Sequence, residues 1–517
     1  MARSARIKAD CAPPTTNLQR AQSFDTGGIV LSVGRFTSYN LIGAAIPLAL
    51  TFFTVPIYLT LVGIDRVGIL SLAWLLLGYF GLFDLGLGKA TAFRIAGQRD
   101  AMPEERATTL WAALIVNVGM GLIGGLILWA VSYVYFTHFF KVSESLRPEI
   151  ISTVPLLALS VPVATLTGVL TGALQGREKF LESNKISTIS TILFQLVPLC
   201  VAWLWSQSLV WLLASALLTR GLTLIALWRL CSAEFTAGHK PHVDRAAVKA
   251  LLGYGGWVSF NGLIGPFLVI FDRFAIGGVL GATALGYYYV PFQIAKQLAI
   301  IPGSLTGAMF PKLTIATPAA SEALSRKAIM TLIAVITVPV LVGMMIFDPF
   351  LTLWVGRTIA DNAATVGRVL LIAFWCNAMA LVPFTQLQAA GKPRIVTVIL
   401  ALQIPFYMAA LYFGMAWFGV VGCAIALTLR MGVDFVMQSC GVDGKVQCAL
   451  PIFGTLLLLI AMAFATTWLA TFSAAWWGSS IVLILIGMIA SWAAMPRDVR
   501  NQLLATAKRW GLNRSRR

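Results

Sequence analysis

The sequence predicts an all-α polytopic membrane protein with about 14 transmembrane helices. Two pseudo-symmetric six-helix bundles would surround a central cavity, and two further helices would follow. Three observations predict this class. Only 11% of the 517 residues are charged and 58% are hydrophobic, whereas a soluble domain is roughly 25% charged. Apolar runs long enough to cross a roughly 30 Å hydrocarbon core recur along the chain. Motifs of the first half also return in the second half, in the same order.

Short charged or turn-rich breaks separate the apolar runs. The first half contains predicted spans at 38–62, 69–92, 109–136, 152–175, 186–205 and 208–229. The second half contains predicted spans at 252–276, 284–309, 327–349, 368–390, 395–413 and 417–437. Two more follow at 450–470 and 475–494.

These spans divide the chain into six segments. We expect a disordered cytosolic N-terminus (1–37), which has no apolar signal-peptide core, an N-terminal six-span lobe (38–232), a cytosolic linker (233–250), a C-terminal six-span lobe (251–438), two extra helices (439–494) and a basic cytosolic tail (495–517). Anionic lipid headgroups would attract the basic tail.

The distribution of Lys and Arg predicts the orientation. With the N-terminus inside, 28 of these residues fall on the cytosolic side and five fall outside, namely Arg66, Lys141, Arg147, Arg357 and Arg368. Cytosolic loops of membrane proteins carry the excess of positive charge. Both termini should therefore be cytosolic, in a multi-pass protein.

The internal repeat rests on several short matches. Ser38-Tyr39-Asn40 is matched by Ser259-Phe260-Asn261, the glycines of Gly63-x4-Gly68 by Gly281-x4-Gly286, and Arg220 by Arg430. Each repeat has six spans, so the two lobes share one orientation, and a solute site is expected between them.

Charged and polar residues inside spans mark the expected site, because a charge at mid-membrane costs about 2.5 to 3.5 kcal/mol on insertion scales. The predicted cationic, substrate-binding lumen consists of Arg220, Arg430, Lys296, Arg273 and Lys89. The predicted polar lumen consists of Asn40, Thr51, Thr54, Tyr58, Asn261, Tyr289, Gln293 and Gln297. The candidates for a coupling ion are Asp84, Asp272 and Asp434.

The residues leave alternatives open. Lys89 and Arg273 lie near predicted span ends and could extend to the headgroups. Asp84 and Asp272 could exchange a cation, or Lys89 and Arg273 could keep them ionised as structural partners. Arg430 and Asp434 lie one helical turn apart, and this spacing predicts a salt bridge between them.

No catalytic chemistry is expected. The external loops are short, and no metalloprotease, hydrolase or dinucleotide motif is present. The stretch Gly86-Leu87-Gly88-Lys89 lacks the first glycine of a phosphate-binding loop, because Phe83 occupies that position. The three histidines and seven cysteines are scattered, so no metal site is expected. No bound cofactor is expected either. The basic residues follow the predicted membrane topology, so no nucleic acid is expected as a partner.

Several motifs carry a family resemblance. The stretch from Pro56 through Gly68, the run Phe83-Asp-Leu-Gly-Leu-Gly88, and the pairs Asp272-Arg273 and Phe310-Pro311 resemble those of bacterial polysaccharide transporters. These are the Wzx-type O-antigen and exopolysaccharide flippases of the multidrug/oligosaccharidyl-lipid/polysaccharide (MOP) exporter superfamily, whose fold is MATE-like. The resemblance extends from about Ser38 to Gln438.

The resemblance implies a secondary transporter of the bacterial inner membrane rather than an enzyme. It would flip a polyprenyl-diphosphate-linked oligosaccharide by alternating access, for O-antigen, capsule or exopolysaccharide synthesis, with H⁺ or Na⁺ coupling or none. Its partners would be membrane lipids, a polysaccharide polymerase and a chain-length regulator. Two alternatives stay open: a MATE-type multidrug or cation antiporter, and a flippase for the lipid-linked peptidoglycan precursor.

Overall fold

The computed structural model describes residues 26–79, 87–98, 102–236, 268, 270–443, 445 and 448–501, without the side chains of 26–48, 77–79, 89 and 443. The predicted N-terminal segment before residue 26, most of the linker and the tail after residue 501 lie outside this part. Every contact described below lies within residues 53–517, which form one unit.

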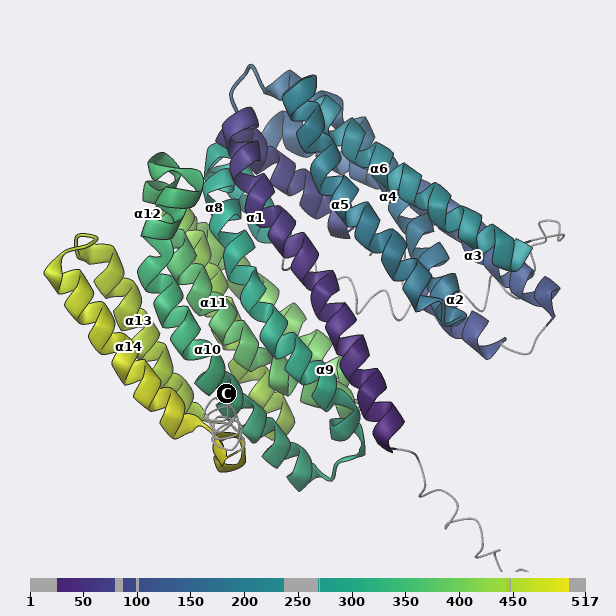
Figure 1. Ribbon diagram of the computed structural model, residues 1–517. Helices are drawn as coiled ribbons and strands as arrows, with labels where there is room; N and C mark the ends of the chain where they lie inside the picture. Colours follow the sequence, from purple (N-terminus) through teal and green to yellow (C-terminus); the bar gives the residue numbers. More distant parts are fainter. Residues whose placement is uncertain are drawn as a thin grey trace, which may run out of the picture. The chain divides into compact units, whose positions relative to one another are not determined.

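The described chain is helical, which confirms the prediction of an all-helical membrane protein. The first half consists of α1 (Thr26–Tyr79), α2 (Leu87–Gly97), α3 (Pro103–Val134), η2 (Tyr135–Phe139), α4 (Arg147–Gly176), α5 (Phe180–Leu204), α6 (Leu209–Cys231) and η3 (Ser232–Thr236). The second half begins in a helix over residues 270–279 and continues with α8 (Ala282–Ala295), η4 (Lys296–Ala299), α9 (Ile300–Ile315), α10 (Pro318–Val355), α11 (Arg357–Ala389) and α12 (Pro393–Asp443). Figure 1 shows these helices in chain order.

Eleven helical stretches of the described part are long and apolar enough to cross a membrane. Two of them change direction at a glycine, α1 at Gly63 and α12 at Gly419. Gly63 directly follows the predicted span 38–62, and Gly419 lies close to the predicted boundary between 395–413 and 417–437. The predicted seventh span, 252–276, falls mostly outside the described residues.

Of the five glycines with positive φ in the described chain, four form tight turns at connections that the sequence predicts to be outside, and the fifth, Gly391, lies between α11 and α12. Gly63 and Gly419 have φ angles of 82° and 56°, and Gly281 and Gly356 have φ angles of 97° and 93°. Side chains with a Cβ rarely adopt this left-handed region, whereas glycine does so without steric cost. The backbone can therefore reverse its direction with almost no loop.

The glycines of the internal repeat also occupy equivalent places in space. Gly63 and Gly281 share nearly the same backbone angles, with ψ values of 164° and 179°. Gly68 and Gly286, five residues further on, face each other across the two halves: a Cβ on Gly68 would lie 2.9 Å from the Gly286 nitrogen and would collide with the Ala282 carbonyl oxygen. The absence of side chains lets the two helices approach at backbone distance.

Helix α11 forms the centre of the second half. It packs against α8, α9, α10 and α12, and most of its residues are buried. Trp375 is fully buried on this helix, and its indole N–H donates a hydrogen bond of 3.1 Å to the Thr337 hydroxyl of α10. The neighbouring helices are therefore arranged around a rigid and apolar axis.

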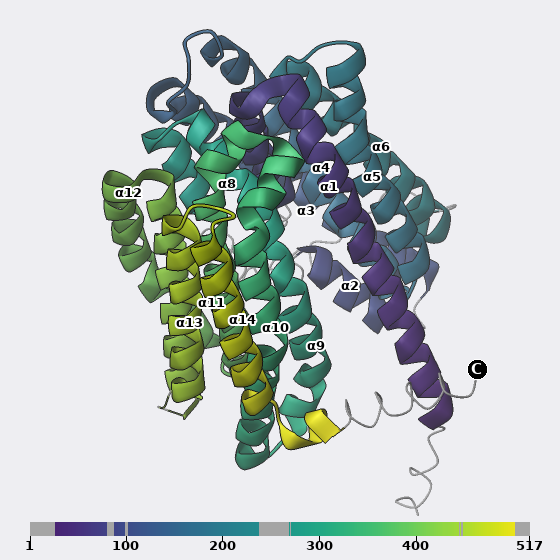
Figure 2. The same ribbon diagram turned by 60° about the vertical axis from the view of Figure 1, so that its left-hand side comes forward.

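The last two helices, α13 (Ala449–Trp468) and α14 (Ala474–Ala494), pack against each other and against α10. They lie side by side in both views (Figure 1, Figure 2). The Thr471 hydroxyl, between them, donates a 3.0 Å hydrogen bond to Asp348 of α10. Asp348 also lies 4.0 Å from Arg368. Arg368, the first residue of the predicted span 368–390, lies inside α11, which already begins at Arg357, and it is 4% exposed.

Replacing Gly68 by Ala tests the close approach of the two halves. We expect Gly68→Ala to destabilise the purified protein by about 1 to 3 kcal/mol, because the new methyl group must displace the backbone of Ala282. Thermal unfolding in detergent measures this effect as a lower Tm.

The matched control is Gly307→Ala in α9, where a Cβ would meet nothing within 4 Å. Alanine is favoured over glycine in helices by roughly 1 kcal/mol, so this variant should keep or raise the Tm. Equal Tm values for the two variants would show that Gly68 and Gly286 do not limit the packing.

Candidate functional site

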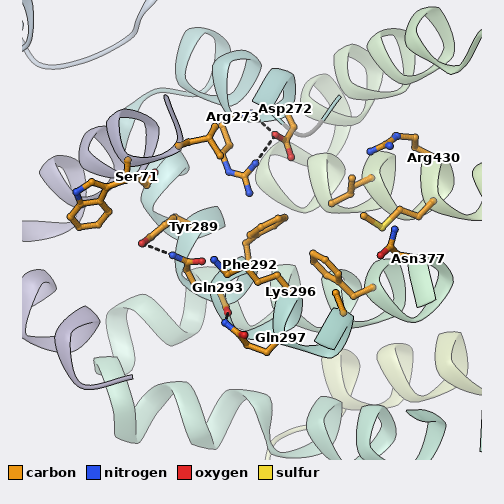
Figure 3. A pocket seen from close by; sticks show the side chains of 16 residues that line it. Ser71, Asp272, Arg273, Tyr289, Phe292, Gln293, Lys296, Gln297, Asn377 and Arg430 are labelled. Carbon is orange, nitrogen blue, oxygen red and sulfur yellow. Dashed lines mark hydrogen bonds and ion pairs between the residues drawn. The ribbon is translucent and has the colours of Figure 1, made fainter. Parts of the chain in front are cut away.

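A cavity of about 550 Å³ lies between the first and second halves of the chain (Figure 3). The first half contributes residues of α1, and the second half contributes residues of the 270–279 helix, α8, η4, α11 and α12. The lining consists of Ser71, Trp74, Leu75, Asp272, Arg273, Tyr289, Phe292, Gln293, Lys296, Gln297, Ala299, Phe374, Asn377, Leu427, Arg430 and Met431. Seven of these were predicted from the sequence: Asp272, Arg273, Tyr289, Gln293, Lys296, Gln297 and Arg430.

Asp272 and Arg273 form a buried ion pair at one wall of the cavity, and they are 1% and 3% exposed. The Asp272 carboxylate accepts hydrogen bonds from the Arg273 backbone N–H at 2.8 Å, from the Arg273 guanidinium at 3.3 Å and from the Tyr288 hydroxyl at 2.9 Å. The Arg273 guanidinium also lies 4.0 Å from the centre of the Phe292 ring. The structure therefore shows the Asp272 carboxylate paired with Arg273, and the Arg273 side chain is buried.

Arg430 approaches the cavity from α12. Its guanidinium lies 5.5 Å from the centre of the Tyr407 ring, an arrangement that attracts a cation to the ring face. Its Nε is buried and has no hydrogen-bond partner among the described residues. The predicted salt bridge with Asp434 is wrong, because Asp434 instead accepts hydrogen bonds from Gln403 and Gln438. Arg430 is consequently available to an anion in the cavity.

Lys296 begins a short 3₁₀ turn that interrupts the α-helix of the eighth predicted span. The chain leaves α8 at Ala295, forms the 3₁₀ turn η4 and resumes as α9 at Ile300. A stretch of 3₁₀ helix within a long helix often marks a functional hinge. Lys296 is exposed, and it has no ion-pair partner within the described part of the chain. Its charge is thus open to a ligand.

The predicted polar residues of the eighth span, Tyr289, Gln293 and Gln297, are linked to one another by hydrogen bonds. The Gln293 amide donates to the Tyr289 hydroxyl at 2.6 Å, and the Gln297 amide donates to the Gln293 carbonyl oxygen at 3.1 Å. Figure 3 shows Tyr289, Gln293 and Gln297 along the cavity. This row offers further amide and hydroxyl groups to a polar ligand.

The balance of charge in the cavity is positive. Its lining contains the cations Arg273, Lys296 and Arg430 and one carboxylate, Asp272. Because Arg273 already neutralises Asp272, Lys296 and Arg430 carry the net charge.

Arg220 is not among the lining residues, although it is the repeat equivalent of Arg430. Its guanidinium lies 4.5 Å from the centre of the Phe194 ring of the preceding helix α5. Arg430 has the same relation to Tyr407, which lies in the helix before its own turn at Gly419. Each half therefore positions one arginine of its sixth span over an aromatic ring of its fifth.

The predicted residues of the first span whose side chains are described, Thr51, Thr54 and Tyr58, do not line the cavity. Thr54 and Tyr58 are buried, and the Tyr58 hydroxyl donates to the Gln195 carbonyl oxygen at 3.0 Å. The Tyr58 ring packs edge-on against Trp74, which does line the cavity. Thr51 belongs to the separate unit that ends at Phe52. The predicted candidates that lie outside the described residues or side chains are Asn40, Asp84, Lys89 and Asn261.

The sequence analysis missed several lining residues. Asn377 is an amide inside an apolar span and could have been found by the same criterion as Gln293. Ser71, Trp74 and Phe374 had no such signal, because small and aromatic residues are common throughout membrane spans. Whether these side chains face the cavity depends on how α1 and α11 are rotated about their own axes, which only the structure shows.

One end of the interface between the halves is closed by direct contacts. The Thr283 hydroxyl donates to the Asp65 carboxylate at 2.6 Å, and the Tyr135 hydroxyl donates to the Phe274 carbonyl oxygen at 2.6 Å. The backbone of Lys141 makes hydrogen bonds with Gly277 and Ala282, both 3.1 Å long. All these residues lie at or near connections that the sequence predicts to be outside.

Comparison with known proteins gives both family and fold. The family model described as "Polysaccharide biosynthesis protein" matches residues 61–357, more than half of the chain. A candidate O-antigen transporter of Shigella flexneri is 27% identical over 412 residues, which cover 79% of this chain and 97% of that protein.

Two solved structures share the fold. The lipid II flippase MurJ, in an inward closed conformation, aligns with a TM-score of 0.67 and 12% identity over 89% of this chain and 99% of its own. An inward-facing MATE family transporter of the MOP superfamily aligns with a TM-score of 0.61 and 14% identity over 82% of this chain and 98% of its own.

The resemblance stated from the sequence motifs is thus confirmed for family and fold. The proteins named in these comparisons are described as transporters or a flippase. It is a multi-pass membrane protein with the MOP fold, and it belongs to the polysaccharide biosynthesis protein family.

Proposed function

We propose that this protein flips polyprenyl-diphosphate-linked oligosaccharide units across the bacterial inner membrane, for O-antigen, capsule or exopolysaccharide synthesis. The positive charge of the cavity carries the proposal. Lys296 and Arg430 form no ion pair within the described structure, and the one carboxylate of the lining is paired with Arg273. A diphosphate is the part of such a substrate that would complement this charge.

The other lining residues suit the rest of the headgroup. The amides of Gln293, Gln297 and Asn377 can exchange hydrogen bonds with sugar hydroxyl groups, and Trp74 and Tyr289 offer flat rings. A volume of about 550 Å³ is typical of sites for small ligands. We infer that the cavity takes the diphosphate and the adjoining sugars, while the polyprenyl chain stays in the lipid.

The proposed architecture has fourteen spans, as two six-span lobes and two extra helices, with both termini in the cytosol. The excess of Lys and Arg on the predicted cytosolic side supports this orientation. The contacts around Asp65, Lys141 and Thr283 would then close the periplasmic end. Flipping would require them to open while the opposite end closes.

The relative from Shigella flexneri supports an O-antigen substrate over the alternatives. A MATE-type antiporter for cationic drugs would need an acidic cavity, and Asp272 is the one acidic lining residue and is already neutralised. A lipid-linked peptidoglycan precursor carries the same diphosphate, so it would differ from the proposed substrate in its sugars. A polysaccharide polymerase and a chain-length regulator are the partners that the proposal implies.

Removing either unpaired cation of the cavity, Lys296 or Arg430, should strongly reduce the activity. In a host strain lacking the gene, we expect Arg430→Ala and Lys296→Ala each to restore flipping at least about tenfold less well than the wild type. Loss of a hydrogen bond to a charged group costs roughly 1.5 to 3 kcal/mol. Quantifying lipid-linked oligosaccharides in the cytosolic leaflet, together with surface polysaccharide, measures the effect.

Arg357→Ala is the matched control, because Arg357 is 65% exposed and pairs with Asp361 outside the cavity. It should behave as the wild type. If deletion of the gene changes no lipid-linked pool but raises sensitivity to cationic drugs, the flippase proposal is wrong and the antiporter replaces it.

Locking the closed end tests alternating access. In a variant without native cysteines, Asp65→Cys with Thr283→Cys places two thiols at a contact of 2.6 Å between the native oxygens. A short, reducible thiol cross-linker should stop flipping, and reduction should restore it. The single-cysteine variants treated in the same way are the control. Full activity of the cross-linked protein would rule out opening at this contact.

A further inference from the structure

Arg430 is a cavity-lining arginine whose position is not fixed by a carboxylate. It reaches the cavity from the second span of α12 (Figure 3). Asp434, one turn further on, accepts its hydrogen bonds from two glutamines, and Asp272 is paired with Arg273. An arginine side chain loses much rotational freedom when it is held in one place. Another contact must therefore keep Arg430 at the cavity.

The contact that the structure shows is with the ring of Tyr407. Tyr407 belongs to the first span of α12 and is 2% exposed, so the surrounding side chains hold its ring in place. The Arg430 guanidinium lies 5.5 Å from the ring centre, within the roughly 6 Å over which a ring face attracts a cation. The Tyr407 hydroxyl has no hydrogen-bond partner among the described residues. The ring, and not the hydroxyl, is thus the part of Tyr407 that contacts Arg430.

The first half repeats this contact with a ring that has no hydroxyl group. Arg220 lies in α6, and its guanidinium is 4.5 Å from the ring centre of Phe194 in α5. In each half the ring belongs to the fifth span and the arginine to the sixth. Phenylalanine and tyrosine share the aromatic ring and differ in the hydroxyl. The ring face is therefore the feature that the two halves have in common.

A ring face and a carboxylate hold an arginine with different chemical consequences. A carboxylate would neutralise the guanidinium and accept hydrogen bonds from up to two of its N–H groups. A ring attracts the charge without neutralising it and without taking up an N–H···O hydrogen bond. The Arg430 Nε is accordingly buried without a hydrogen-bond partner in the described part of the chain. An arginine held in this way keeps both its charge and its donors for a ligand.

We propose that Tyr407 is a positioning residue of the cavity. Its ring face keeps the Arg430 guanidinium in place for the diphosphate of the substrate and leaves the charge and the N–H groups free. Tyr407 is not among the lining residues, so it acts through Arg430 and does not touch the ligand. Its role in transport rests on the proposed function, whereas its effect on anion binding is measured without transport.

Inorganic pyrophosphate tests this role on the purified, full-length protein. It is added at constant ionic strength without divalent metal ions, and thermal unfolding is followed in detergent, because a ligand that binds the native state raises the Tm. We expect the midpoint concentration of this rise to stay within about twofold of the wild type in Tyr407→Phe and to increase about tenfold in Tyr407→Leu. Arg430→Ala should increase it at least as much, and Arg357→Ala, outside the cavity, should not change it.

The charge distribution of the ring separates attraction of the cation from simple packing. Phenylalanine with one, two or three fluorine atoms, introduced in place of Tyr407, has nearly the same size, and each fluorine weakens the attraction of the ring face for a cation. We expect the midpoint concentration to rise with each fluorine, to about fivefold with three. Phe347, which is 3% exposed and has no cation over its ring among the described residues, is the control position. Fluorination there should change nothing. This series decides the question even if Tyr407→Leu does not fold.

Three outcomes would overturn the role of Tyr407. These are no effect of pyrophosphate on the wild type, an undiminished effect in Arg430→Ala, and equal midpoints throughout the fluorine series. The proposed flipping is judged separately, by the lipid-linked pools of the deletion strain. Unchanged pools would refute flipping and leave the effect of Tyr407 on anion binding in place.

Discussion

The high cost of an uncompensated charge within the hydrocarbon region determines how this protein arranges its polar residues. Asp272 is compensated by Arg273 and Tyr288, and Asp348 by Arg368 and Thr471. Arg220 and Arg430 lie over aromatic rings instead of beside carboxylates. An aromatic ring attracts a cation but leaves its net charge in place. The protein thereby keeps positive charge inside the membrane without neutralising it, which is the condition for attracting an anionic headgroup.

The two halves share several structural features but contribute unequally to the cavity. Each has a tight glycine turn after its first span, a second glycine at the contact with the other half, and an arginine over an aromatic ring. The cavity is nevertheless lined mainly by the second half, which supplies all four charged lining residues. The first half contributes Ser71, Trp74 and Leu75 of α1. Gene duplication would explain the common framework, and the later divergence of side chains would explain why one half carries the charges.

Much of the fold could be predicted from the sequence, because span length, charge bias and repeated glycines are local properties of the chain. Most of the charged candidates in the second half also lie together in the structure. The partner of Asp434 could not be predicted, because an i, i+4 spacing permits a salt bridge but does not exclude better acceptors and donors on a neighbouring span. The different positions of Arg220 and Arg430 relative to the cavity were equally inaccessible, because they depend on how each helix is rotated. Trp74 shows the same limit for aromatic residues.

The glycine turns also determine how much of the chain is available to molecules in the surrounding water. Gly63, Gly281, Gly356 and Gly419 all join spans on the side that the sequence predicts to face the periplasm. At these four places the chain passes from one helix to the next with hardly any intervening peptide. A protease or an antibody needs several extended residues to bind, and these turns do not provide them. These four turns should accordingly resist digestion and antibody binding, and an epitope tag would be tolerated better in a longer connection, such as the one between η2 and α4.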